Sequence, residues 1–98
     1  MNQPRFHRLA KAELQEATLH YAGESSALGG RFLLEISEAL GFLLRFPKGA
    51  QSVSGEIRCF PLNRFPFSIV YRPLLDGGLR ILAIAHQSRK PGYWSRRQ

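Results

Sequence analysis

The sequence is short of cysteine, of acidic residues and of long apolar runs, and each shortage excludes a class of protein. Its 98 residues contain one cysteine, Cys59, so an internal disulfide or a zinc site built on cysteines cannot form. No apolar stretch approaches the roughly 20 residues that a membrane-spanning helix needs. The first residues also lack the apolar centre of a signal peptide. We therefore expect a cytoplasmic protein that does not contact a membrane.

The shortage of acidic residues is concentrated in the second half of the chain. Seven Asp and Glu residues stand against fourteen Lys and Arg, which gives a net charge of +7. Residues 1–44 carry a net charge of −1, whereas residues 45–98 hold ten basic and two acidic residues, a net charge of +8. Most of the bases are Arg, which pairs well with phosphate and carboxylate groups. The second half is therefore predicted to bind an acidic partner: nucleic acid, an acidic peptide, or both.

The apolar content that is present suffices for one folded domain. Hydrophobic residues make up 44% of the chain and aromatic residues 11%, which is typical of globular proteins. A chain of 98 residues is also shorter than most proteins with two domains. We expect a single domain over residues 1–98.

Two amphipathic helices are predicted in the first half. The first helix has apolar residues three or four positions apart: Ala10, Leu14, Ala17 and Tyr21. Residues 23–26 break this pattern and offer an N-cap to a second helix, which runs from about Ala27 to Arg45. Pro47 ends that helix, because proline lacks the amide donor. Two adjacent apolar helices with a short link predict a helical hairpin.

Patterns of short strands flank these helices. Residues 4–9 predict a first strand at an edge of the sheet, and residues 48–55 are polar and loop-like. Three runs rich in β-branched and aromatic residues predict further strands at residues 57–62, 65–72 and 79–86, the last two joined by a hairpin turn at Asp76-Gly77-Gly78. The order β-α-α-β-β-β predicts an α+β fold, with the helical hairpin packed on one face of an antiparallel sheet.

Alternation along the last two strands divides their side chains between the two faces of the sheet. The set expected to face the helices is Phe67, Ile69, Tyr71, Leu79, Ile81, Ala83 and Ala85. The set expected on the other, open face is Ser68, Val70, Arg72, Arg80, Leu82, Ile84 and His86. An apolar patch rimmed by charge is typical of a partner-binding surface. Leu82 and Ile84 could equally pack beneath the loop at residues 48–55, and both interpretations stay open.

The segment after the last strand is basic and contains two aromatic residues, Tyr93 and Trp94. Such a segment can stack on bases or enter a pocket of a partner, or its rings can pin it to the domain. We expect a structural role for Trp94. No acidic residue lies nearby in the sequence to pair with Arg89, Arg96 and Arg97, so a binding role is predicted for these three.

Four segments of the second half together resemble the RelE/ParE toxin superfamily. They are GEIR at residues 55–58, RFPFSIVY at 64–71, ILAIAH at 81–86 and RKPGYW at 89–94. Residues 12–17 and 28–32 resemble the two helices of that family, so the likeness covers nearly the whole chain. The second segment and the last two resemble the ParE branch more closely than the RelE branch. The resemblance implies the toxin of a bacterial type II toxin–antitoxin pair, which inhibits bacterial growth, takes part in plasmid stabilization and is wrapped by a co-encoded antitoxin.

The resemblance allows two activities of different classes. ParE-branch toxins are non-catalytic inhibitors of DNA gyrase, whereas RelE-branch toxins are metal-independent endoribonucleases that cut messenger RNA in the ribosome. An endoribonuclease needs a general base, a general acid and cations around the scissile phosphate. Residues that could match these roles are Arg58, Arg64, His86, Arg89 and Tyr93. Residues 51–56 contain none of the lysines that RelE toxins place in this loop, so gyrase inhibition is the leading expectation and the chain is not expected to be an enzyme.

The resemblance and the charge pattern also assign candidate binding residues, with no metal and no cofactor. The residues expected to bind the target are Arg89, Lys90, Tyr93, Arg96 and Arg97. The residues expected to bind an acidic antitoxin are Arg58, Arg72, Arg80, Leu82 and Ile84. The toxin could form a dimer, or a heterotetramer with its antitoxin. A non-toxic relative that retains only antitoxin binding is a third possibility.

Overall fold

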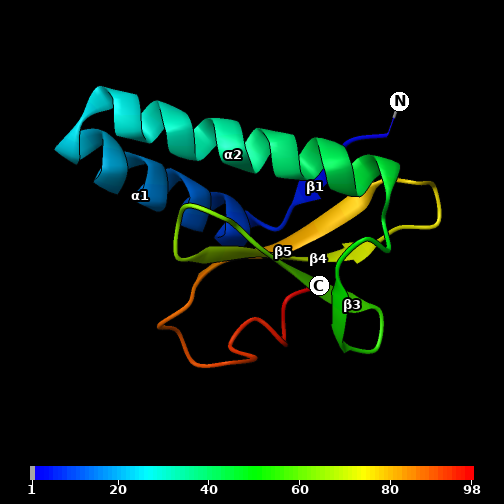
Figure 1. Cartoon of the computed structure of the whole chain (residues 1–98). Coiled ribbons are helices and arrows are strands. Elements are labelled where there is room, and N and C mark those ends of the chain that lie inside the picture. Colours follow the sequence, from blue (N-terminus) through cyan, green and yellow to red (C-terminus); the bar gives the residue numbers. More distant parts are fainter. Residues whose placement is uncertain (1) are drawn as a thin grey trace.

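The two helices are separated by a single residue, as the break in their apolar pattern predicts. The computed structural model describes residues 2–98 and shows α1 (Arg8–Glu24) and α2 (Ser26–Arg45) side by side above a sheet (Figure 1). The hydroxyl oxygen of Ser25 accepts a hydrogen bond of 3.0 Å from the amide of Leu28, so this residue is the predicted N-cap of α2. The apolar stripe of α2 faces the sheet and is buried at Phe32, Ile36, Ala39, Leu40 and Leu43.

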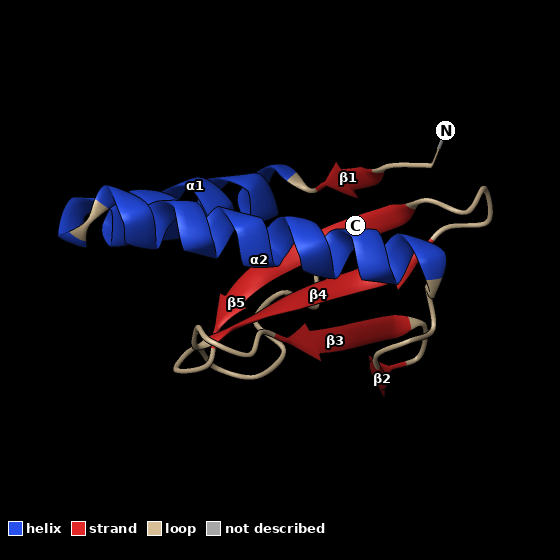
Figure 2. Ribbon diagram, turned by 45° about the horizontal axis from the view of Figure 1, so that its top comes forward, coloured by secondary structure: helices blue, strands red, loops and turns tan. Residues whose placement is uncertain are grey.

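Within residues 2–98, the helical hairpin covers one face of a five-stranded sheet, which confirms the α+β fold. The strands are β1 (Pro4–Phe6), β2 (Gln51–Ser54), β3 (Ile57–Pro61), β4 (Phe67–Pro73) and β5 (Leu79–His86). They lie in the order β1-β5-β4-β3-β2, so β1 and β2 form the two edges (Figure 2). The bounds of β5 and the edge position of β1 are those predicted from the sequence.

Two features of the sheet correct the expectations drawn from the sequence. Residues 51–54, expected within a loop, form β2 and pair with β3, because their exposed side chains carry no apolar alternation that would reveal a strand. The sheet is also mixed rather than antiparallel. β1 runs parallel to β5, with Arg5 beside Arg80, while the other neighbouring strands are antiparallel.

A β-bulge in β5 changes which side chains face the helices. Val70 of β4 pairs with Ala83 and Tyr71 pairs with Ile81, so Leu82 is an extra residue without a partner on β4. Side chains alternate with a period of two, so one extra residue moves all later side chains to the opposite face. The predicted faces of Ala83, Ala85, Ile84 and His86 are therefore wrong. Ala83 and Ala85 lie on the face away from the helices, Ile84 joins the core beneath the helices, and the His86 ring contacts Phe67 at 5.0 Å between centroids.

The two faces of the sheet carry separate apolar clusters. Beneath the helices, Tyr21, Phe32, Phe65 and Phe67 form an aromatic group whose ring centroids lie 4.9–6.2 Å apart. On the other face, Val70, Leu82 and Ala83 are almost fully buried although no helix covers them. In Figure 1 the C-terminal segment passes beneath the sheet on this side. This segment, rather than the loop at residues 48–55, covers Leu82.

Candidate functional site

The C-terminal segment, residues 87–98, forms a series of tight turns against the sheet. Main-chain bonds close successive turns, from the amide of Tyr93 to the carbonyl of Lys90 at 3.2 Å and from the amide of Arg97 to the carbonyl of Trp94 at 2.9 Å. The rings of Tyr93 and Trp94 are half-buried and pack on the cluster of Val70, Leu82 and Ala83. The two rings therefore hold the segment on the sheet, in agreement with the structural role predicted for Trp94.

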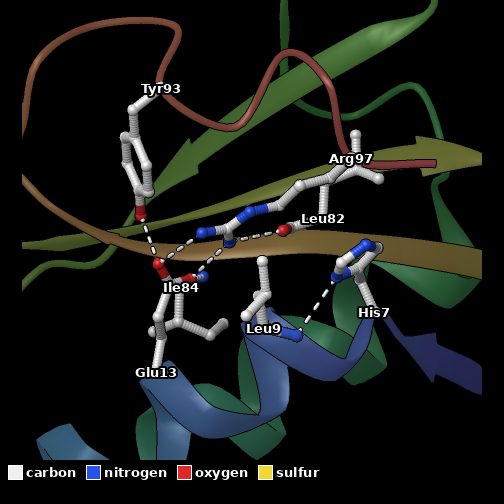
Figure 3. Close-up of polar contacts among 7 residues, drawn as sticks. All are labelled: His7, Leu9, Glu13, Leu82, Ile84, Tyr93 and Arg97. Atoms are coloured by element: carbon white, nitrogen blue, oxygen red, sulfur yellow. Dashed lines mark hydrogen bonds and ion pairs between the residues drawn. The ribbon is translucent and has the colours of Figure 1, made fainter.

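Glu13 of α1 fastens this segment to the rest of the molecule (Figure 3). One carboxylate oxygen accepts from Arg97 Nη1 at 2.8 Å and from the amide of Ile84 at 3.1 Å. The other accepts from the Tyr93 hydroxyl at 2.8 Å and from Arg97 Nη2 at 3.0 Å. Arg97 also donates to the carbonyl of Leu82 at 2.9 Å. Glu13 and Arg97 thus bind main-chain groups of β5 at its extra residue, Leu82, and just after it, beyond the end of the short strand β1.

The Glu13–Arg97 pair is largely shielded from water. The side chains are 18% and 12% exposed, so the pair is screened far less than a surface ion pair. Burial, and then the hydrogen bond to Glu13, raise the pKa of Tyr93 to about 12. The hydrogen bond to Glu13 also raises the pKa of Arg97. At neutral pH the Tyr93 hydroxyl therefore stays protonated and donates a hydrogen bond to Glu13.

A cleft of about 500 Å³ lies between α1, the end of β5 and the C-terminal segment. Its walls bring together three of the five residues predicted for an endoribonuclease: His86, Arg89 and Tyr93. The Arg89 guanidinium lies 3.9 Å from the centroid of the Tyr93 ring. The amide of Ser88 donates to His86 Nδ1 at 3.0 Å, which leaves Nε2 as the other ring nitrogen available to a ligand. Glu16 and His20 of α1 line the same cleft.

The other two predicted endoribonuclease residues lie elsewhere. Arg58 pairs in register with Tyr71, at the opposite end of β4 from the Phe67–His86 pair, and donates to the carbonyl of Ala50 at 2.7 Å. Arg64 lines a separate hollow of about 360 Å³ beside α2. The five side chains do not surround one phosphate-sized site. Within residues 2–98, no group of three His, Cys, Asp or Glu side chains is arranged to hold a metal ion, those around the cleft included.

The common open face expected for antitoxin binding does not form. Arg72 and Arg80 lie on the face away from the helices, whereas Arg58 shares the helix-covered face with its partner Tyr71. Leu82 and Ile84 are each 1% exposed, and the bulge places them on opposite faces. Leu82 and Ile84 are therefore core residues in this structure. Arg72 and Arg80 are half-buried and remain available at the surface.

The five residues predicted to bind a target also divide into two groups. Arg89, Lys90 and Arg96 are exposed on the C-terminal segment. Tyr93 and Arg97 are held by Glu13, 80 and 84 positions away along the chain. The expectation that no acidic residue pairs with Arg97 is wrong, because it considered only neighbours in the sequence. Glu13 stands three residues after buried Ala10 and four before buried Ala17, so its helical spacing could have placed it on the buried side of α1.

The chain is similar to known proteins in sequence and in fold. Residues 5–91 match the model of the ParE toxin of the type II toxin–antitoxin system parDE. This chain belongs to the ParE toxin family. A solved structure described as a chromosomal ParDE TA system from P. aeruginosa is similar to this ParE-family chain, with 26% sequence identity and a TM-score of 0.70. The likeness covers 88% of this chain and 96% of that one. No curated protein matches the chain.

Family membership identifies the chain as a type II toxin with an antitoxin partner. It also confirms the resemblance drawn from the segments at residues 64–71 and 81–94. Among the described residues of this ParE-family chain, no helix is long and apolar enough to cross a membrane.

Proposed function

We propose that this ParE-family toxin acts in the cytoplasm as a non-catalytic inhibitor of DNA gyrase and is neutralised by an acidic cognate antitoxin. The observation that carries the proposal is the C-terminal segment. Glu13 and Arg97 fix its path, and its three exposed bases, Arg89, Lys90 and Arg96, form no ion pair within residues 2–98. A rigid segment with unpaired bases loses little conformational freedom on binding and suits an acidic or phosphate-bearing target.

Two observations favour a binding role for this segment over RNA cleavage. The bases that an endoribonuclease would use are divided, since Arg58 and Arg64 lie apart from the cleft. The Tyr93 hydroxyl is engaged in a hydrogen bond to Glu13. The pKa of Tyr93, about 12, opposes transfer of its proton to a leaving group near neutral pH.

One observation supports cleavage of messenger RNA as the second candidate. His86, Arg89 and Tyr93 line one cleft, where the imidazole Nε2–H and the guanidinium could both donate to a scissile phosphate. The gyrase proposal has to be tested directly against this alternative.

The test compares purified variants with the same change in net charge. Wild-type toxin is expected to inhibit gyrase supercoiling, and Arg89→Gln with Lys90→Gln should weaken that inhibition about tenfold or more, because these exposed bases meet the target. The control Arg31→Gln with Arg45→Gln alters two exposed bases of α2 and should inhibit as the wild type does. In cells that lack antitoxin, filamentation and a DNA-damage response with intact bulk messenger RNA are expected.

Primer extension on ribosome-associated messenger RNA separates the alternatives. Ribosome-dependent cuts that disappear in His86→Ala would show the toxin to be an endoribonuclease. Absence of both gyrase inhibition and RNA cuts would identify a non-toxic relative.

A further inference from the structure

Three arginines from adjacent strands form a row across the sheet on the face away from the helices. Arg5 of β1 lies beside Arg80 of β5, and Arg80 lies opposite Arg72 of β4. Residues paired in this way project from the same face of a sheet. The positions next to Arg80 and Arg72, such as Ile81 and Tyr71, belong to the core beneath the helices, so the three arginines project from the other face. Neighbouring strands lie about 4.8 Å apart, so the arginine row spans about 10 Å.

The arginine row opposes folding, because like charges placed opposite each other on a sheet repel. Only one acidic side chain within residues 2–98 offsets it: Asp76, which pairs with Arg5 at the surface. Arg80 donates from Nε to the main-chain oxygen of Gln98 at 2.8 Å. Burial first, and then the charges of Arg80, Arg97 and Arg8, lower the pKa of His7 beside the β1 edge. Arg72 and Arg80 are left without an aspartate or glutamate partner among the described residues.

We propose that the arginine row binds an acidic helical segment of a partner protein. The row already donates to protein oxygens, since Arg5 donates to the carboxylate of Asp76 and Arg80 donates to the main-chain oxygen of Gln98. Side chains at positions i and i+4 of a helix lie about 5–6 Å apart, close to the spacing of strands, so acidic residues four apart fit successive arginines when a helix lies across the strands. Binding replaces the Gln98 oxygen on Arg80 and leaves the Glu13–Arg97 pair in place. Identification of this partner as the antitoxin rests on the proposed function, whereas the binding itself does not.

Fluorescence anisotropy with two labelled synthetic peptides tests the proposal. One is an alanine-based helical peptide with Glu at positions i, i+4 and i+8, and the other has the same composition with its Glu residues redistributed. The first is expected to bind wild-type toxin more tightly. Arg72→Gln with Arg80→Gln should weaken its binding about tenfold or more, with a smaller dependence on salt, because two charge-assisted contacts are lost. The control Arg31→Gln with Arg45→Gln makes the same change in net charge on α2 and should bind as the wild type does.

Several outcomes would overturn the proposal. Equal losses in the two double variants would mean that net charge alone attracts the peptide, and equal binding of the redistributed peptide would exclude the helical spacing. Tighter binding of a single-stranded oligonucleotide that depends on Arg72 and Arg80 would make the row a nucleic-acid surface. If the double variant does not fold, Arg72→Lys keeps the charge without the bidentate geometry, and unchanged peptide affinity in this variant would exclude Arg72. Gyrase inhibition by wild-type toxin is measured separately, so failure of the proposed function and failure of the arginine row give different results.

Discussion

At the scale of single residues, Glu13 joins three parts of the molecule: α1, β5 and the C-terminal segment. Its two carboxylate oxygens accept four hydrogen bonds, from a main-chain amide of β5 and from two side chains of the C-terminal segment. A carboxylate with this many charged and neutral donors is satisfied in spite of its burial. The position of the basic segment therefore depends on a helix near the other end of the chain.

Removal of Arg97 tests this dependence. Arg97→Ala leaves the shielded Glu13 carboxylate without its cation, so we expect the free energy of unfolding to fall by about 2 kcal/mol, less than for a fully buried pair because both side chains retain some exposure. The matched control is Arg96→Ala, next in the sequence but exposed, which should change it by less than about 0.5 kcal/mol. Urea denaturation measures both. Equal effects of the two changes would show that the Glu13–Arg97 pair does not stabilise the fold.

Tyr93 makes the stability of the toxin depend on alkaline pH. Its pKa is raised from 10.0 to about 12 in the folded protein, so the unfolded chain loses this proton first as the pH rises. The stabilisation is fully present below pH 10 and is lost as the pH rises toward about 12. Tyr93→Phe lacks this group, so the difference in unfolding free energy between wild type and variant should shrink over that range. Denaturation curves at a series of alkaline pH values check this, and a constant difference would contradict it.

At the scale of the elements, the close approach of α1 and α2 depends on one glycine. An added Cβ at Gly29 would lie 2.9 Å from the Cβ of Ala22, closer than real side chains come, whereas an added Cβ at Gly30 would meet nothing within 4 Å. Both residues lie inside α2, where alanine is the better helix former. The two positions therefore separate packing between helices from the intrinsic preference of the chain.

Alanine substitutions at these neighbouring glycines should have opposite effects. Gly29→Ala forces the helices apart and should lower the free energy of unfolding by about 1–3 kcal/mol. Gly30→Ala lies in open space and should raise it by up to about 1 kcal/mol. Thermal unfolding followed by circular dichroism measures the direction of each change. A stabilising Gly29→Ala would show that the helices can separate at little cost.

The bulge in β5 is the element-scale feature with the largest consequence. It places Leu82 and Ala83 together beneath the C-terminal segment and turns Ile84 into the core below the helices. Arg97 binds the carbonyl of the extra residue, Leu82, and Glu13 binds the amide of Ile84, two residues further along β5. The irregular strand and the ion pair that fastens the C-terminal segment are thus parts of one arrangement.

At the scale of the whole molecule, the helical layer and the sheet layer differ in net charge. The helical layer is built from the first half of the chain, which has a net charge of −1, and most of the sheet and the C-terminal segment come from the second half, which has a net charge of +8. The face away from the helices therefore combines the arginine row with a basic segment. Two separate groups of bases, one proposed for the target and one for an acidic partner, can coexist on this side because they lie on different elements.

The sequence by itself determined the elements whose signals are local. Helical spacing and the capping Ser25 define α2, and the run from Leu79 to His86 after a Gly-Gly turn defines β5. These signals act over a few residues, because hydrogen bonding within a helix and alternation along a strand are short-range properties. The order of elements follows from them, whereas the family resemblance rests on the segments at residues 55–58, 64–71, 81–86 and 89–94.

Only the tertiary structure decided the features that depend on contacts between distant parts of the chain. The parallel pairing of β1, the strand at residues 51–54 and the extra residue in β5 arise from register between strands, which no local pattern specifies. The pairing of Glu13 with Arg97 joins residues 84 positions apart. Burial of charge depends on where the chain folds back, so the sequence predicted the basic character of the C-terminal segment, while the fold decided which of its arginines is held and which are free to bind.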